Sequence, residues 1–166
     1  MSQCVLGIDP GMNGAICCLD GDSVATSVMP TIGNCTDEST LYNILKGVPR
    51  PKMVFLESVH ASPLFGAKGN FKLGTDYGLI KGILFSLSLP YTEVSPQRWQ
   101  KIMHQGISST LKPKERSLLA LNRRFPGMDV RATGRSTKPH DGIVDAILIA
   151  HYGYFQLESM AKLDIN

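Results

Sequence analysis

Apolar residues in the first part of the chain come in short runs that end at turn-forming residues. The run at 4–9 (CVLGID) ends at a Pro-Gly pair, the run at 15–19 (AICCL) ends at an Asp-Gly pair, and residues 23–29 form a third run. Asp-Gly between short apolar runs is typical of a β-hairpin, and Pro-Gly is typical of a turn. The chain is therefore predicted to begin with an antiparallel meander of three strands.

The rest of the chain alternates helices with two more strands. Apolar runs predict strands at 52–57 and 91–94, whereas segments rich in Gly, Pro and basic residues predict loops at 58–73 and 126–139. Thr36 and Ser95 are expected to cap helices. The predicted helices are 36–46, 74–89, 97–104, 112–125 and 141–160. This alternation indicates a single α/β domain over residues 1–166, with a mixed five-stranded sheet (the antiparallel meander, then parallel strands) and helices on both faces.

Two of the predicted strands end in a carboxylate. A right-handed crossover would place the strands at 4–9 and 52–57 side by side and parallel at the centre of the sheet. Their last residues are Asp9 and Glu57. Since ligands of open α/β sheets gather at the carboxyl ends of the strands, these two side chains are candidates for one site.

The last helix carries two further acids, one turn apart. Asp141 and Asp145 lie in KPHDGIVDAILIAH, where the residues around Asp145 are apolar. Like charges at this spacing repel, and a buried unpaired charge is costly. Bound Mg²⁺ would relieve both problems, and two ions per site can support phosphodiester hydrolysis by water. We therefore interpret Asp9, Glu57, Asp141 and Asp145 as catalytic metal-binding acids.

Each acid also has a simpler explanation. Asp9 could form only a turn, Glu57 could face solvent at the end of a strand, and Asp141 could be only a helix cap. Asp145 is the hardest to explain without a ligand. The predicted topology brings the four to one end of the sheet, which makes the set more specific than any member.

Two neighbours of Asp141 are further candidates. Lys138 lies three residues before it, where its ammonium could reach a phosphate or the attacking water, although it could equally be a surface lysine. His140 could bind phosphate, act as an acid or base, or help to form the metal site. The alternative is a histidine at the start of a helix with no catalytic role.

Charge is distributed unevenly along the chain. Residues 1–45 hold five acids and no Lys or Arg, whereas residues 96–140 hold ten bases and two acids, a net charge of +8. Such asymmetry favours a polyanionic partner, nucleic acid above all, over an ordinary solvated surface. No apolar run approaches the length of a membrane span, and the four cysteines show no metal-site spacing. We expect no membrane partner, a cytoplasmic location, and cysteines that are reduced and buried.

Several segments together resemble a known family. GIDPGMNGAI at 7–16, VFLESV at 54–59 and HDGIVDAILIAH at 140–151, with YGLIKGIL and SPQRWQKIM between them, resemble the RuvC-like Holliday junction resolvases, nearer the phage and organellar branches. The resemblance implies a ribonuclease-H-like fold and a homodimer. It implies a crossover junction endodeoxyribonuclease of DNA recombination and repair, which nicks paired strands of a four-way junction with Mg²⁺ or Mn²⁺. A phage-encoded member would act in the host cytoplasm.

The resemblance assigns metal-binding roles to Asp9, Glu57, Asp141 and Asp145. The chain departs from the family in the last helix. In the family, the last two ligand positions lie three residues apart, so the position three residues before Asp145 would carry a ligand. Gly142 stands at that position here, and Asp141 comes one residue earlier. The fourth ligand is thus Asp141 or, in reserve, His140.

The resemblance also suggests which residues meet DNA. In the family, the loop after the second acid meets the junction centre. In loop 58–73, Phe65 or Phe71 could stack on a base, and Lys68 and Lys72 could hold phosphates, although each Phe could instead form a small satellite core. Basic residues are expected to follow the duplex arms: Lys112, Lys114, Arg116, Arg123, Arg124, Arg131 and Arg135. Gly74, Gly78 and Gly82 mark a flat helix face as the expected dimer interface.

Three other functions use the same features. The chain could be another ribonuclease-H-like nuclease that cuts flaps, other branched DNA or RNA–DNA hybrids. It could bind nucleotides like the actin and hexokinase group, although such proteins need two domains of this kind. It could also be a non-catalytic junction-binding module, although acids near a phosphate backbone repel DNA unless a metal is bound.

Overall fold

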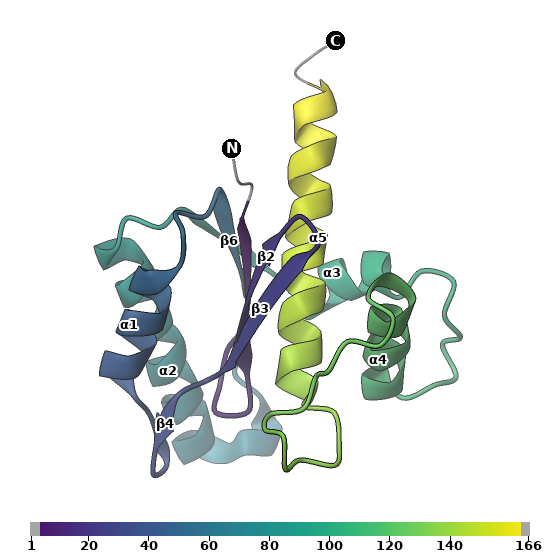
Figure 1. Ribbon diagram of the computed structural model, residues 1–166. Helices are drawn as coiled ribbons and strands as arrows, with labels where there is room; N and C mark the ends of the chain where they lie inside the picture. Colours follow the sequence, from purple (N-terminus) through teal and green to yellow (C-terminus); the bar gives the residue numbers. More distant parts are fainter. Residues whose placement is uncertain (1–3, 164–166) are drawn as a thin grey trace.

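A mixed sheet lies at the centre of the molecule (Figure 1). The structure is a computed structural model, and it describes residues 4–163. Within that range, five strands form one sheet in the order β3-β2-β1-β6-β7, and two short strands form a separate pair, β4-β5. The strands are β1 (Val5–Asp9), β2 (Ala15–Asp20), β3 (Ser23–Val28), β4 (Thr31–Ile32), β5 (Cys35–Thr36), β6 (Met53–Glu57) and β7 (Tyr91–Val94). The helices are α1 (Glu38–Gly47), the 3₁₀ turn η1 (Pro63–Phe65), α2 (Gly66–Ser86), α3 (Pro96–Met103), α4 (Pro113–Arg124) and α5 (Asp141–Leu163).

The pairing of the strands confirms the predicted topology. β1, β2 and β3 form the antiparallel meander, while β1 pairs with β6 and β6 with β7 in parallel. Ile8 lies opposite Leu56 in the β1-β6 register. The next residue of each strand is an acid, so Asp9 and Glu57 emerge side by side from the same edge of the sheet.

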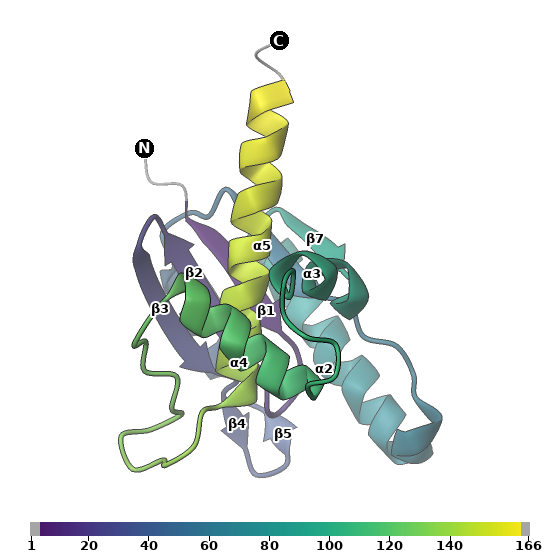
Figure 2. The same cartoon turned by 90° about the vertical axis from the view of Figure 1, so that its right-hand side faces the viewer.

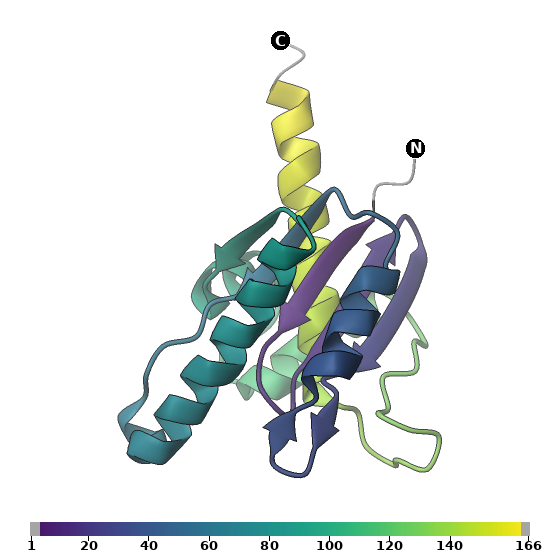
Figure 3. The ribbon, with the colours of Figure 1, turned by 90° about the vertical axis from the view of Figure 1, so that its left-hand side faces the viewer.

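Helices cover both faces of the sheet, as predicted. α1 and α2 lie across one face (Figure 3), and α3, α4 and α5 cover the other (Figure 2). Leu6, Ile8 and Leu56 contribute to the core under α1 and α2, whereas Val5 and Phe55 contribute to the core under α5. The C-terminal half of α5 extends beyond the sheet (Figure 1).

Two glycines let α5 approach the sheet closely. A Cβ on Gly7 of β1 would lie 2.2 Å from the carbonyl oxygen of Ala146, and a Cβ on Gly142 would lie 2.2 Å from that of Asn13. The first turns of α5 therefore pack directly on β1 and on the turn that follows it. This contact sets Asp141 and Asp145 beside Asp9.

The prediction of a loop at 58–73 is wrong in its second half. α2 begins at Gly66 rather than at residue 74, so Lys68, Phe71 and Lys72 lie on a helix. The glycines and Asn70 lower helix propensity in this segment, which is why the sequence indicated a loop. The Asn70 amide both accepts from the backbone N–H of Ser62 and donates to its carbonyl, each at 2.9 Å, and so ties the first turns of α2 to the preceding segment.

Smaller expectations are also corrected. The cap of α1 is Asp37, whose carboxylate accepts from the backbone N–H of Thr40 at 3.0 Å. The cysteines are not all reduced and buried, because Cys4 and Cys18 are joined by a disulfide and Cys35 is exposed.

A helix that crosses a membrane must be both long and apolar. None of the helices between residues 4 and 163 meets both conditions.

Candidate active site

Four acidic residues belong to the elements that come together where β1 and β6 end, at the bottom of Figure 1. Asp9 closes β1, Glu57 closes β6, and α5 supplies Asp141 as its first residue and Asp145 one turn later. The negative charges of Glu57, Asp145 and Asp141, in that order, act on Asp9. The structure therefore brings together the four acids that the sequence singled out.

Burial and mutual repulsion raise the pKa of three of these acids. Burial first, and then the three neighbouring charges, raise the pKa of Asp9 to about 8. Burial raises the pKa of Glu57 to about 7, although a hydrogen bond from Trp99 opposes the shift. Burial also raises the pKa of Asp145 to about 6, and a hydrogen bond from the Ser117 hydroxyl opposes it. The cluster thus retains protons near neutral pH unless a cation replaces them.

The donors of this cluster suit a divalent cation. Asp145 Oδ1 is buried and has no hydrogen-bond partner in the described part of the chain. A buried carboxylate oxygen without a donor or a cation beside it is energetically costly. Carboxylate oxygens are the ligands that Mg²⁺ prefers. As the side chains stand, however, no three His, Cys, Asp or Glu side chains within residues 4–163 are close enough to share an ion. The acids are neighbours, but they do not form the closed cage that the sequence suggested.

Glu57 is held by a tryptophan from the neighbouring element. Glu57 pairs with Val94 in the β6-β7 register, and Ser95 then caps α3. One turn into that helix, Trp99 Nε1 donates a hydrogen bond to Glu57 Oε2 at 2.6 Å. The strand register and the capped helix together place the indole beside this carboxylate.

Asp141 is held by a lysine from α4. Lys114 Nζ donates to Asp141 Oδ2 in an ion pair whose partners are both exposed. Lys114, Lys138, Asp141 and Asp145 all line one cleft beside the start of α5. Lys138, which was predicted to reach a phosphate or the attacking water, thus lines the same cleft as two of the acids, but Lys114 is the lysine that pairs with one of them.

His140 caps α5. Its Nδ1 accepts from the backbone N–H of Ile143 at 3.3 Å, and its carbonyl accepts from the N–H of Val144 at 3.1 Å. His140 thus performs the structural role that the sequence left open as an alternative to metal binding. A side chain at residue 142 would collide with the turn at Asn13, so no ligand could stand there without moving that turn.

The segment proposed to meet the junction centre presents two aromatic rings. Phe65 and Phe71 are exposed to 59% and 79%, so neither forms the small core considered as the alternative. Lys68 is also exposed. Lys72 differs, because its ammonium pairs with the buried Asp76 at 2.9 Å and is therefore occupied inside the protein.

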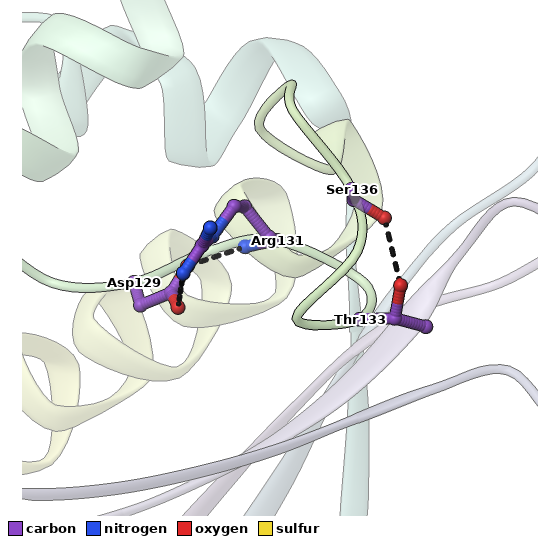
Figure 4. A network of polar contacts seen from close by, with 4 residues as sticks. All are labelled: Asp129, Arg131, Thr133 and Ser136. Carbon is purple, nitrogen blue, oxygen red and sulfur yellow. Dashed lines mark hydrogen bonds and ion pairs between the residues drawn. The ribbon is translucent and has the colours of Figure 1, made fainter.

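The other basic residues of α4 and the following loop differ in how far they are exposed. Lys112 and Arg123 are exposed, Arg116 and Arg124 are half-buried, and Arg135 lies on the loop before α5. Figure 4 shows two contacts that shape this loop. Arg131 forms two hydrogen bonds to the Asp129 carboxylate, at 2.8 and 2.7 Å, and Thr133 and Ser136 join their hydroxyls at 3.1 Å. Because Arg131 already pairs with an acid, its charge is less available than that of Arg135.

Sequence reasoning missed Trp99 and Ser117 as neighbours of the acids, and it gave Lys114 only a DNA-binding role. One signal was available for Trp99. The chain has a single tryptophan, and it lies one turn after the cap of the helix that follows β7. Ser117 and Lys114 gave no such signal, since their placement depends on how α4 packs against α5.

Known proteins resemble this chain in structure rather than in sequence. No family model and no curated protein matches the chain. Among solved structures, RuvC of Thermus thermophilus superposes with a TM-score of 0.60 at 17% identity, covering 94% of this chain and 96% of RuvC. This chain has the RuvC fold. The structure of T. thermophilus RuvC in complex with a Holliday junction substrate gives a TM-score of 0.59 at 14% identity, with the same coverage of both chains. The yeast mitochondrial Holliday junction resolvase Ydc2 gives 0.51 at 14% identity, covering 89% of this chain and 77% of Ydc2. The expectation of a ribonuclease-H-like fold is confirmed.

Proposed function

We propose that this chain is a structure-specific endonuclease that resolves four-way DNA junctions by divalent-metal-dependent hydrolysis of phosphodiester bonds. The observation that carries the proposal is the group of four neighbouring acids, three of them with raised pKa, at the carboxyl edge of β1 and β6. Likeness to a solved RuvC complex with a Holliday junction supports a branched DNA substrate.

Asp9, Glu57 and Asp145 would hold the metal, with Asp141 as the fourth ligand. Mg²⁺, which Mn²⁺ would replace, supplies a water of lowered pKa and charge stabilisation for the leaving oxygen, and the family resemblance implies two ions. Asp145 contributes the orphan Oδ1, and Asp9 is the acid most strongly affected by its neighbours. Binding of one ion by all three would require these side chains to move closer together than they stand.

Basic side chains at the cleft would position the DNA. Lys114 and Lys138 line the cleft next to Asp141 and Asp145, where their ammonium groups can bind the phosphate that is cut. A phosphate that draws Lys114 away would release Asp141 for the metal. Exposed bases on α4 and its following loop add affinity for the duplex arms without reading sequence.

We also infer that the protein acts as a homodimer through the exposed face of α2. Gly74, Gly78 and Gly82 lie on that face, and a Cβ on any of them would have no heavy atom within 4 Å. Phe71 and Phe85, both exposed, lie seven residues on either side of Gly78. Two antiparallel copies centred on Gly78 would set each Phe71 opposite Phe85 of the other copy, which leaves Phe65 as the ring available to the DNA. Such an isologous pair presents two identical sites to a two-fold substrate.

The proposal is tested by cleavage of matched synthetic substrates. A four-way junction, a flap, an RNA–DNA hybrid and a linear duplex of equal length are incubated with the protein, with Mg²⁺ or with a chelator. We expect paired symmetric nicks in the junction, little cutting of the duplex or hybrid, and no cutting under chelation.

Two outcomes would favour the other functions. Equal cutting of hybrid or flap and junction would make the chain a more general nuclease of this fold. Tight junction binding with no cutting in either metal would make it a binding module.

A further inference from the structure

The indole of Trp99 is the one aromatic donor that touches the acidic cluster among the described residues. Trp99 is fully buried, and its Nε1 lies 2.6 Å from Glu57 Oε2. An indole N–H donates and does not accept, so it cannot bind a metal itself. Its effect on Glu57 is to hold one carboxylate oxygen in a fixed direction.

The surroundings of the indole limit its movement. Ser95 caps α3 by accepting from the N–H of Arg98 at 3.3 Å, which sets the first turn of the helix. The Trp99 ring packs edge-on against the ring of His104, with centroids 5.7 Å apart. His104 is buried and lies 3.2 Å from the Ser117 hydroxyl through Nε2. Burial and this ring contact therefore oppose movement of the donor when Glu57 turns.

A second link joins the same group of residues to the cluster. Ser117, whose hydroxyl lies next to His104, also lines the cleft that Asp145 lines. Two of the four acids thus lie near residues connected to α3, Glu57 beside Trp99 and Asp145 in the same cleft as Ser117. The other two acids have no such support from α3.

We propose that Trp99 is a positioning residue that fixes Glu57 for the divalent ion of the nuclease centre. The inference rests on the proposed function, because it takes Glu57 as a metal ligand. By occupying Oε2, the indole leaves Oε1 for the ion and opposes rotation of the carboxylate away from Asp145. The competing explanation is that Trp99 only fills the core and that its N–H uses the nearest acceptor.

The test removes the N–H while keeping the shape of the ring. Trp99 is replaced by benzothienylalanine, which has sulfur in place of the N–H group, and Trp99→Phe serves as a genetic variant. Mn²⁺ binding without DNA is measured by electron paramagnetic resonance, and folding is checked by circular dichroism and thermal melting. We expect Mn²⁺ affinity to fall by about 10- to 100-fold in the benzothienylalanine protein, as for loss of other partners that orient a ligand.

A matched control separates positioning from packing. Tyr152 is also a buried aromatic, and it packs edge-on against Phe55 with ring centroids 6.0 Å apart. Tyr152→Leu is expected to lower the melting temperature and to leave Mn²⁺ affinity within about 2-fold of wild type, a difference of about 0.4 kcal/mol.

The outcomes distinguish this inference from the proposed function. If the folded benzothienylalanine protein binds Mn²⁺ as tightly as wild type, Trp99 is a core residue only, and junction cleavage by the wild type is unaffected by that result. If Mn²⁺ binding weakens as expected but the wild type cuts no junction, positioning stands and the proposed function fails. If the wild type binds no Mn²⁺, both fail.

Discussion

Asp76 on α2 and Asp145 on α5 are both helix acids that are at least partly buried, but their surroundings differ. Asp76 Oδ1 accepts from the Thr36 hydroxyl at 3.0 Å, and Oδ2 accepts from Lys72 Nζ at 2.9 Å. Asp145 Oδ1 is buried without a hydrogen-bond partner in the described residues. Burial raises the pKa of Asp145 to about 6.

The difference separates an acid with a structural role from one that we propose binds a metal. Asp76 is satisfied by residues of its own chain and ties β5 to α2, so it needs no ligand. Asp145 is tolerable when a proton or a cation compensates its charge. A buried acid is therefore a good site candidate when its partners are missing, and a poor one when they are present.

Neutralising Asp145 and neutralising Asp76 should differ most in their effect on junction cleavage. Asp145→Asn should lower junction cleavage in Mg²⁺ by more than about 100-fold, since even residues that only support a metal ligand cost 10- to 100-fold. Junction binding should be kept or tightened, because a negative charge near the DNA is removed. Single-turnover cleavage and gel-shift assays measure the two quantities. Asp76→Asn is the control, and equal losses in the two variants would refute the distinction.

For stability, we expect the opposite order, with the larger loss on removal of Asp76. Asp76→Ala leaves the Thr36 hydroxyl and the Lys72 ammonium without their partner, and it should lower the free energy of unfolding by about 1–3 kcal/mol. Urea denaturation with chelator measures the loss. Asp145→Ala should cost less than Asp76→Ala, and the opposite order would contradict the assignment.

The acidic cluster should also make the metal-free protein less stable as pH rises. The pKa values of Asp9, Glu57 and Asp145 in the folded protein are about 8, 7 and 6, whereas such carboxyls titrate near about 4 in an unfolded chain. Between about pH 4 and pH 8 the folded state therefore binds more protons, and the free energy of unfolding falls as pH rises.

Thermal melting in chelator across that range measures the slope. Asp145→Asn should flatten the slope, and saturating Mg²⁺ should offset the loss at pH 8. If neither Asp145→Asn nor Mg²⁺ changes the dependence of stability on pH, the acidic cluster does not cause that dependence.

The smallest expected effect concerns the two lysines that pair with helix acids. Lys114→Gln should weaken junction binding and reduce the dependence of log K on log salt by about 1, as expected for loss of one phosphate contact. Lys72→Gln removes a partly exposed ion pair and should cost about 0–1 kcal/mol of stability without changing junction affinity. Junction binding measured over a series of salt concentrations distinguishes the two variants. If Lys114→Gln and Lys72→Gln show the same dependence of log K on log salt, Lys114 does not contact the DNA.

Much of the fold could be predicted because it depends on local patterns. The apolar runs before Asp9 and Glu57 and the turn residues between them determine the meander and the central parallel pair. The start of α2 could not be predicted, because Gly66 and Gly69 have low helix propensity and a contact of Asn70 with Ser62 supports this turn. Tertiary contacts overrode local preference there.

The acids of the site could be predicted better than their partners. A strand-ending carboxylate and a charge inside an apolar helix are visible in the sequence, which is how Asp9, Glu57 and Asp145 were found. Trp99 meets Glu57 only through the β6-β7 register, and Lys114 meets Asp141 only through the packing of α4 on α5. Such contacts depend on tertiary structure that the sequence pattern does not specify.

A divalent cation that Asp9, Glu57 and Asp145 share, as we propose, would be visible in an anomalous difference map from crystals of the protein soaked in MnCl₂. We expect a manganese peak bound by oxygens of these three carboxylates, and no such peak in Asp145→Asn crystals soaked in the same way. A wild-type map with no peak at these acids, or with manganese bound only elsewhere, would contradict this proposal.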